Sequence, residues 1–110
     1  MILASGFAPI GAFHESGLDV GIATDGAASN DSLNYLEVLK STATIHKGFT
    51  EDATVISAET VLKMATIEGV RVIGREKDLG SIEVGKKLTA LFLTPLDLLM
   101  EHLAMIILLI

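Results

Sequence analysis

The chain contains no cysteine and only two prolines, and aromatic residues make up 5% of its 110 residues. The lack of cysteine excludes disulfide bonds and thiolate metal sites and leads us to expect a reducing, cytoplasmic location. Basic residues are also few: Lys and Arg number 8 against 14 Asp and Glu, for a formal net charge of -6. Because phosphate-backbone binding needs clustered basic residues and the longest basic run is Lys86-Lys87, we expect no nucleic-acid partner.

Long uncharged apolar runs are missing as well. Residues 1–6 lack the basic region and long apolar core of a signal peptide. Residues 96–110 are strongly apolar, but Asp97 and Glu101 interrupt them, and a bilayer span needs roughly 20 apolar residues. We therefore expect no membrane-spanning segment. We interpret residues 96–110 as a buried or partner-covered helix, with a membrane-surface role or a non-native tail as the alternatives.

The composition is that of one small folded domain, because half of the residues are hydrophobic and the mean hydropathy is +0.56. Periodicity and turn residues predict an α/β order of elements. These are a loop over residues 6–11, a short helix over 13–16 ended by Gly17, a buried strand over 18–24, helices after Asn30 and Ser57, and a second strand over 88–94. Two strands do not form an independent sheet, so the chain resembles part of a larger α/β protein.

Two helices have clear sequence signals. The first is predicted to be capped by Asn30 or Asp31 and to end at Gly48. Its apolar face consists of Leu33, Leu36, Leu39, Ala43 and His46. The second is predicted to be capped by Ser57, to end at Gly69 and to be followed by one more turn before Gly74. Its buried face consists of Val61, Leu62, Met64 and Ala65.

Asp25 is the strongest candidate for a chemically active residue. It follows the apolar residues 20–22 and therefore lies where the predicted strand ends. In α/β proteins, ligands and metals bind at the carboxyl ends of strands. The alternative is a turn aspartate before Gly26, the commonest role of such a residue. The three histidines, His14, His46 and His102, show no metal-ligand spacing.

Five segments resemble metal-dependent amidohydrolases, in particular the branch of methylthioadenosine and adenosylhomocysteine deaminases and chlorohydrolases. The resemblance runs in order over residues 3 to 87 and ends before Pro95. Its segments are Leu3-Ala4-Ser5-Gly6-Phe7-Ala8-Pro9, Ser16-Gly17-Leu18-Asp19-Val20, Ala23-Thr24-Asp25-Gly26-Ala27-Ala28-Ser29-Asn30-Asp31, Lys63-Met64-Ala65-Thr66-Ile67-Glu68-Gly69-Val70-Arg71 and Gly80-Ser81-Ile82-Glu83-Val84-Gly85-Lys86-Lys87.

The resemblance implies the C-terminal portion of a (β/α)8 barrel and a piece of its flanking β-sandwich, mostly helical as a fragment. Residues 1–80 would be the last βα units, residues 81–95 a strand of the sandwich, and residues 96–110 the apolar helix or non-native tail. Asp25 would be a catalytic residue and a ligand of a divalent metal, zinc or iron. Ser29 and Asn30 would face a small-molecule substrate, a purine or triazine-type ring that metal-bound hydroxide deaminates or dechlorinates.

Several departures from the family pattern limit this expectation. A barrel takes about 250 residues, and the family's metal-binding histidines and proton-shuttling glutamate lie upstream of the matched segments. Leu88-Thr89-Ala90 stands where the family continues with Ala-Asp-Leu. We therefore expect no turnover and no bound metal from this chain alone, and a homo-oligomer or a complementing N-terminal half as partner. The alternative is a non-catalytic remnant that associates through its apolar surfaces.

Overall fold

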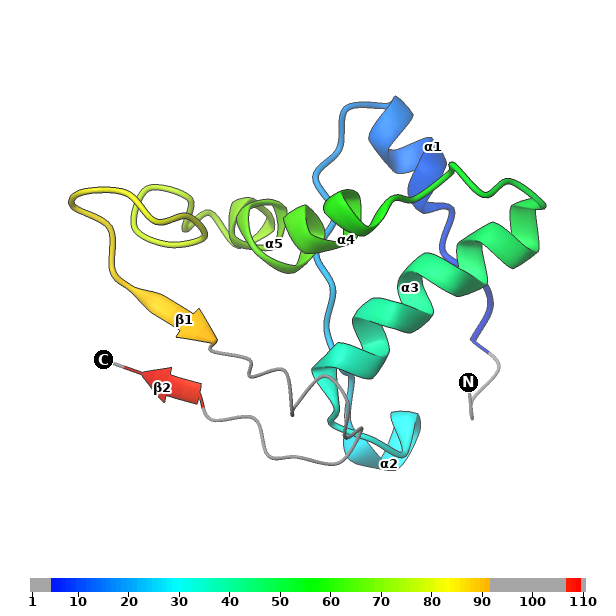
Figure 1. The fold of residues 1–110 in the computed structure, drawn as a ribbon, viewed down its shortest axis with the longest axis horizontal. Coiled ribbons are helices and arrows are strands. Elements are labelled where there is room, and N and C mark those ends of the chain that lie inside the picture. The colour runs from blue at the N-terminus through cyan, green and yellow to red at the C-terminus, as the bar shows by residue number, and fades with distance from the viewer. Residues whose placement is uncertain (1–4, 92–106, 110) are drawn as a thin grey trace.

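The computed structural model describes residues 5–91 and 107–109. This part of the chain forms helices, several of which pack around a small core, and two short strands that lie apart from that core (Figure 1). The elements are α1 (Ile10–Glu15), α2 (Ala27–Asn30), α3 (Tyr35–Thr50), α4 (Ala58–Ala65), α5 (Ile67–Val72), β1 (Thr89–Leu91) and β2 (Ile107–Leu109). None of the helices in these residues has both the length and the apolar character needed to cross a bilayer.

Helix α1 begins directly after Pro9, earlier than predicted, and ends at Gly17 as predicted. Gly17 adopts a φ of 74°, which is favourable for glycine. Its N–H donates to the carbonyl of His14 at 2.9 Å, and the N–H of Leu18 donates to the carbonyl of Phe13 at 3.0 Å. These two bonds satisfy carbonyls that the end of the helix would otherwise leave free, and they direct the chain into residues 18–24.

Helix α3 begins later than the sequence predicted. Its N-cap is Asn34, whose side chain accepts a hydrogen bond from the N–H of Glu37 at 3.3 Å. The prediction of Asn30 or Asp31 as cap was wrong, because Asn30 ends the separate helix α2 and Asp31 leaves helical geometry at a φ of 61°. Gly48 does not end the helix either. One internal glycine costs only about 1 kcal/mol, and α3 continues to Thr50.

The cap of α4 was predicted correctly, since the Ser57 side chain accepts from the N–H of Thr60 at 3.1 Å. The end of the helix was not. Helix α4 stops at Ala65, and Thr66, with a φ of -127° and a ψ of -99°, turns the chain into α5. Gly69 therefore lies inside α5 instead of ending α4.

The core lies where α1, α3 and α4 meet. Its buried apolar residues among those described are Ile10, Ile56, Val61 and Met64, and it is flanked by the partly buried Val20, Ile22, Leu39, Ala43 and Val55. Leu62, predicted to be buried, is 57% exposed because it points away from this core. Several other large apolar side chains are exposed, so much of the apolar content of the sequence remains uncovered in the described structure.

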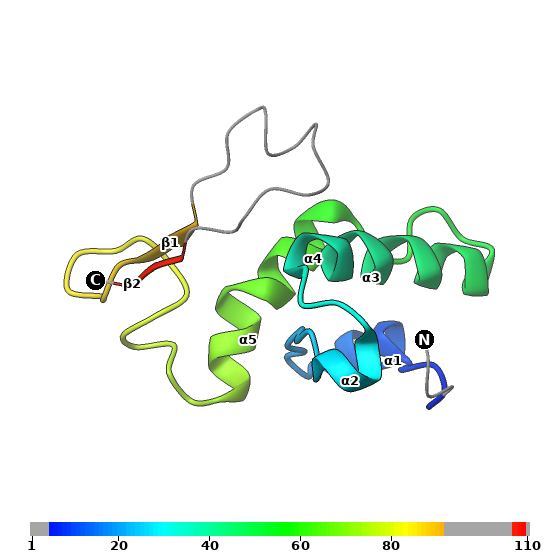
Figure 2. The ribbon, with the colours of Figure 1, turned by 90° about the horizontal axis from the view of Figure 1, so that it is seen from below.

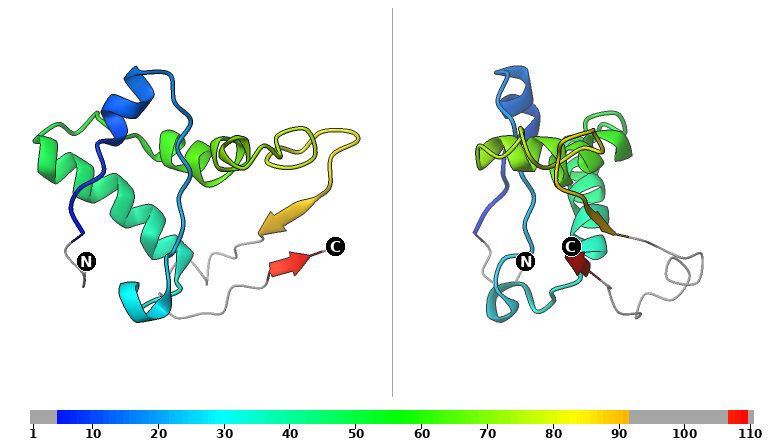
Figure 3. Two further views of the ribbon diagram at one scale, coloured as in Figure 1. Left: turned by 180° about the vertical axis from the view of Figure 1, so that it is seen from behind. Right: turned by 90° about the vertical axis from the view of Figure 1, so that its left-hand side faces the viewer.

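Residues 18–24 do not form the predicted buried strand. They run between α1 and α2 without helix or strand, past α4 and the beginning of α3 (Figures 1 and 3). A strand needs a neighbouring chain to pair its backbone groups, and within residues 5–91 and 107–109 the sole strand pairing is that of β1 with β2. Exposure still alternates along the segment: Val20 and Ile22 are partly buried, whereas Gly21 and Ala23 are exposed.

The strand predicted over residues 88–94 is confirmed for Thr89–Leu91, and residues 92–94 lie outside the described part. Strand β1 pairs antiparallel with β2, in the register Thr89 to Leu109 and Leu91 to Ile107. The pair lies beyond the C-terminal end of α5, on the side away from α1 (Figures 1 and 2). Because Ile107–Leu109 is a strand, the apolar helix predicted over residues 96–110 does not extend to these three residues. Residues 96–106 lie outside the description.

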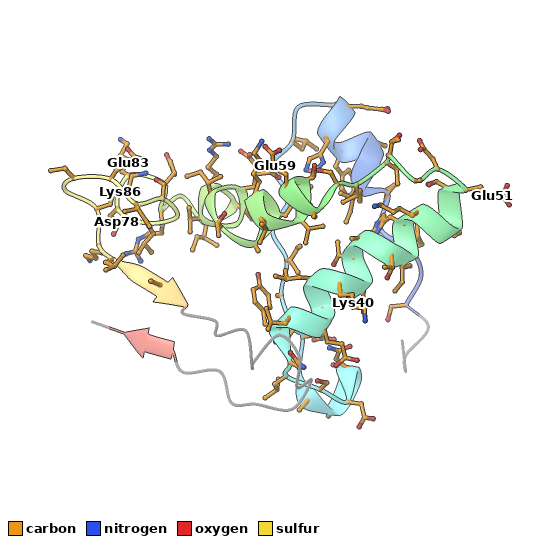
Figure 4. The ribbon with its side chains drawn as sticks, in the orientation of Figure 1. Lys40, Glu51, Glu59, Asp78, Glu83 and Lys86 are labelled. Atoms are coloured by element: carbon orange, nitrogen blue, oxygen red, sulfur yellow. The ribbon has the colours of Figure 1, made fainter. Side chains whose placement is uncertain are left out.

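The connection from α5 to β1 is held by polar side chains, and Figure 4 shows Asp78, Glu83 and Lys86 gathered there. The guanidinium of Arg75 donates to both carboxylate oxygens of Asp78, the shortest contact being 2.6 Å. The Lys86 ammonium donates to the Ser81 hydroxyl at 2.6 Å and lies 3.0 Å from the Glu83 carboxylate. This connection therefore has a defined conformation although it contains no helix or strand.

Candidate functional site

Asp25 lies in a tight turn between residues 18–24 and α2. Its φ of 62° is left-handed, a conformation that aspartate tolerates better than most residues. Gly26 then returns to extended geometry, with a φ of -76° and a ψ of 147°, and serves as the N-cap of α2. The turn leaves the Asp25 side chain fully exposed.

The carboxylate of Asp25 is held by its own turn. The Ser29 hydroxyl donates to Oδ2 of Asp25 at 2.7 Å and also lies 3.0 Å from the Gly26 carbonyl. The hydrogen bond from Ser29 is the larger cause, and that from the Gly26 N–H the smaller, of a pKa of Asp25 below its ordinary value. Asp25 is therefore ionised at neutral pH and is available as an oxygen ligand.

Ser29 and Asn30, the predicted substrate-binding residues, have different surroundings. Ser29 lies against Asp25, as the hydrogen bond shows. The Asn30 amide donates instead to the carbonyl of Ser32 at 3.3 Å and so supports the turn that follows α2. A substrate role for either residue stays a prediction.

The turn around Asp25 offers one suitable ligand for a divalent metal, the carboxylate of Asp25. In the part of the chain that the structure describes, no group of three or more His, Cys, Asp or Glu side chains is placed to hold a metal ion. His14 contacts Glu68 at 3.0 Å, and the ring nitrogens of His46 face backbone carbonyls. A catalytic zinc usually has three protein ligands. Asp25 therefore fits as one member of a ligand set and does not form a site by itself.

Long-range contacts hold the segment that leads to Asp25, and the sequence did not predict them. The Arg71 guanidinium donates to the Asp19 carboxylate at 3.2 Å, and the Tyr35 hydroxyl donates to the carbonyl of Ile22 at 3.2 Å. No local sequence motif predicts these hydrogen-bonded pairs, because the two residues of each pair are distant in sequence. Their only sequence signal is that Asp19 and Arg71 each fall within a segment of the family resemblance.

A groove of about 390 Å³ lies beside the same segment. Residues 21–23 form one side of it, and residues of α4 and α5 form the other. The lining is mostly apolar and includes Ile22, Met64, Val70, Val72 and Ile73. Asp25 thus follows, two residues later in the sequence, the part of the segment that lines the groove, and this segment has no strand partner among the described residues.

Comparison with known proteins agrees with this geometry. The profile of the Amidohydrolase family matches residues 1–106. The chain belongs to the amidohydrolase family. The family match extends beyond Pro95. The expectation that the resemblance ends before Pro95 was therefore wrong.

Curated relatives of this amidohydrolase chain include deaminases and an S-triazine hydrolase. It is 48% identical over 85 residues to a 5-methylthioadenosine/S-adenosylhomocysteine deaminase of Caldanaerobacter subterraneus subsp. tengcongensis, which covers 77% of the chain and 20% of the relative. It is 44% identical over 85 residues to an S-triazine hydrolase of Gordonia rubripertincta, covering 77% of the chain and 18% of that relative. The chain thus spans about a fifth of the length of these relatives.

A solved structure is similar in fold as well as in sequence. The crystal structure of an adenosine deaminase from Xanthomonas campestris, with bound zinc, superimposes with a TM-score of 0.76 and 39% sequence identity. The match covers 86% of this amidohydrolase chain and 22% of the deaminase chain. The described elements therefore have the arrangement found in one portion of a larger deaminase.

Proposed function

We propose that this chain contributes the C-terminal part of a metal-dependent deaminase that acts on the purine ring of nucleosides such as methylthioadenosine and adenosylhomocysteine. In this proposal Asp25 is a metal ligand, and the remaining ligands come from the portion of the enzyme that precedes the matched residues. The chain alone neither holds the metal nor turns over substrate. A divalent metal, zinc or iron, supplies Lewis-acid activation of water.

The observation that carries the proposal is the exposed, ionised carboxylate of Asp25 at the end of residues 18–24. An aspartate is already ionised at neutral pH, and the hydrogen bonds from Ser29 and the Gly26 N–H lower the pKa of Asp25 further. Several of the segments that resemble the family contain carboxylates. Asp25 is the carboxylate in the turn where the family carries its metal-binding aspartate. The zinc named for the Xanthomonas campestris deaminase supports the choice of metal.

The surroundings of residues 18–24 support a barrel in the complete enzyme. The segment lies beside an apolar groove and has no strand partner within the described residues. A barrel strand is paired on both edges and packed on one face by helices. We infer that strands from the N-terminal part of the enzyme pair with residues 18–24 and cover the groove, which makes that part the partner of this chain.

A chimeric enzyme tests the proposal. The final matched portion of the Caldanaerobacter deaminase is replaced by this chain, and deamination of methylthioadenosine is measured with zinc or iron and after chelation. We expect metal-dependent turnover, which Asp25→Asn abolishes because the amide is a poor ligand, whereas the neighbouring exposed Asp31→Asn retains it. A folded chimera with full metal content and no deamination would contradict the proposal.

A second candidate is supported by the exposed apolar surface. Ile82 and Val84 are 90% and 108% exposed, and Leu62, Ile73 and Leu88 are each more than half exposed. Exposed apolar patches favour association between proteins. In this alternative the chain is a non-catalytic remnant that self-associates. Sedimentation of the purified chain at increasing concentration, with Ile82→Ser and Val84→Ser as the comparison, distinguishes a self-associating remnant from a monomer.

A further inference from the structure

We propose that α3 and α5 clamp the segment that carries Asp25, and that Tyr35, Glu68 and Arg71 are positioning residues for its carboxylate. The inference rests on the proposed function, since positioning matters only if Asp25 binds a metal. None of these three residues is a ligand in that proposal. Each acts on Asp25 through the backbone of residues 14–22.

Helix α5 holds the start of the segment through a hydrogen bond between His14 and Glu68 and an ion pair between Asp19 and Arg71. His14 lies 3.0 Å from Glu68, and both side chains are mostly buried, with 27% and 14% of their surface exposed. Asp19 lies 3.2 Å from Arg71. Glu68 and Arg71 are three residues apart on α5 and so lie on the same face of the helix. The two pairs join the end of α1 and the beginning of the segment to one helix.

Beside these two pairs the backbones of the segment and of α5 are in direct contact. A Cβ atom built on Gly21 would lie 3.3 Å from the Cα of Gly69, so the segment contacts α5 without side chains in between. Gly21 and Gly69, from distant parts of the sequence, thus bring two backbones close together, and a side chain on Gly21 would make an unusually tight contact there. This contact fixes the distance of the segment from α5.

Helix α3 holds the segment from the other side. The Tyr35 hydroxyl donates to the carbonyl of Ile22 at 3.2 Å. Burial raises the pKa of Tyr35 above its ordinary value, so the phenol remains a donor over the whole physiological pH range. Tyr35 is the first residue of α3, and it therefore connects the end of the segment to the beginning of a long helix.

The clamp matters because Asp25 follows Ile22 closely and its turn has only local support. The hydrogen bonds from Ser29 and Gly26 fix the carboxylate relative to the turn. They do not fix the turn relative to the rest of the protein. Catalytic groups must be placed within a fraction of an ångström of their working position, so the contacts at Tyr35 and on α5 determine where the carboxylate lies.

The contacts differ in exposure, and this decides which variants are informative. The Asp19–Arg71 pair is about half exposed, and such pairs contribute little alone. We therefore test Arg71→Gln together with Tyr35→Phe, which removes only the hydroxyl. Arg75→Gln is the matched control, because Arg75 forms an ion pair of similar exposure with Asp78 and touches no part of residues 14–22.

The first measurement uses the full chain and needs no activity. Backbone 15N relaxation and the heteronuclear NOE report the order of residues 20–25. We expect the double variant to lower the heteronuclear NOE of these residues and to weaken the cross-peaks between the α-protons of Gly21 and Gly69. The methyl signal of Met64 should remain unchanged, which shows that the core is folded. Unchanged order of residues 20–25 in the double variant would overturn the proposal.

The second measurement uses the chimeric deaminase and separates positioning from general stability. We expect the double variant to lower kcat roughly tenfold to a hundredfold, as for a misplaced catalytic group, with KM changed less than threefold and Arg75→Gln without effect. An equal loss in both variants would show a merely structural role and overturn the proposal. If the parent chimera is inactive, the proposed function fails, and the relaxation measurement alone decides the clamp.

Discussion

Gly21 and Gly69 are in backbone contact although they are far apart in the sequence. Gly21 precedes α2, and Gly69 lies inside α5. A Cβ on Gly69 would lie 2.9 Å from the carbonyl oxygen of Met64 and 3.9 Å from the Cα of Gly21. Real Cβ atoms do not approach backbone oxygens so closely. The sequence interpretation of Gly69 as the end of a helix missed this role, in which glycine is required inside a helix.

We expect Gly69→Ala to destabilise the protein, although alanine favours helix formation. The added methyl forces α5 away from the Met64 carbonyl, at a cost of about 1–3 kcal/mol for overpacking. Gly48→Ala is the matched control, because a Cβ on Gly48 meets nothing within 4 Å and the helix gains from alanine. Chemical denaturation measures the free energy of unfolding of both variants. Equal or greater stability in Gly69→Ala would contradict the close contact.

The titration of Asp25 tests the geometry of its turn. Because the Ser29 hydroxyl is the larger cause of the lowered pKa of Asp25, we expect Ser29→Ala to raise that pKa toward its ordinary value. The 13C chemical shift of the Asp25 carboxyl, followed against pH, measures it. Ser41→Ala, on α3, serves as control and should leave the titration unchanged.

The same hydrogen bonds give Asp25 a defined effect on stability. Its pKa is lower in the folded chain than in the unfolded chain, so the folded state binds fewer protons in the interval between the two values. The stabilising contribution is therefore present above the ordinary pKa of aspartate and is lost as the pH falls through the lowered value. Ser29→Ala should make the free energy of unfolding less dependent on pH in the acid range. A steeper loss of stability with falling pH in the variant would contradict this prediction.

The sequence predicted those features that depend on local chemistry. The Ser57 cap and the Gly17 end are short-range hydrogen-bonding patterns, and both are confirmed. The cap of α3 was misassigned because Asn30, Asp31 and Asn34 are all suitable cap residues, and the choice depends on the left-handed turn at Asp31. Local sequence cannot rank such equivalent candidates.

Features that depend on distant residues were not predictable in this way. The apolar pattern of residues 18–24 predicted a buried strand, but a strand also needs a partner, and none lies within the described residues. The candidate residue Asp25 came from its motif and its place after an apolar run. Its support by Tyr35 and Arg71 came only from the structure, because these contacts join parts of the chain that no periodicity connects.

Substitutions in α4 test how small the core is. Met64 is completely buried, so Met64→Ala should cost about 2–5 kcal/mol, which is comparable to the whole stability of a small domain. We expect this variant to lose its cooperative thermal transition. Leu62→Ala, two residues away and 57% exposed, should change stability by less than about 0.5 kcal/mol. Circular dichroism during heating compares them, and similar melting of the two variants would be inconsistent with the core described.

The buried histidine of α3 provides a further test, because it connects this helix to the chain before α1. The Nδ1 and Nε2 atoms of His46 lie 2.7 Å and 3.1 Å from the carbonyl oxygens of Thr42 and Ala8, and the ring packs against Phe7 with centroids 4.4 Å apart. His46→Leu fills the site with an apolar side chain but removes the polar contacts of the ring.

We expect that change to cost about 0.5–1.5 kcal/mol, since it removes the hydrogen bond between the His46 ring and the Ala8 carbonyl, which keeps the N–H of Ile10 as a second donor. Phe49→Leu is the control, because Phe49 also stacks on Phe7, at 4.0 Å between ring centroids, but is 68% exposed and makes no such hydrogen bond. Urea denaturation should show a clear loss of stability for His46→Leu and a smaller one for Phe49→Leu. The reverse order would mean that ring stacking, and not the hydrogen bond to Ala8, joins α3 to the segment before α1.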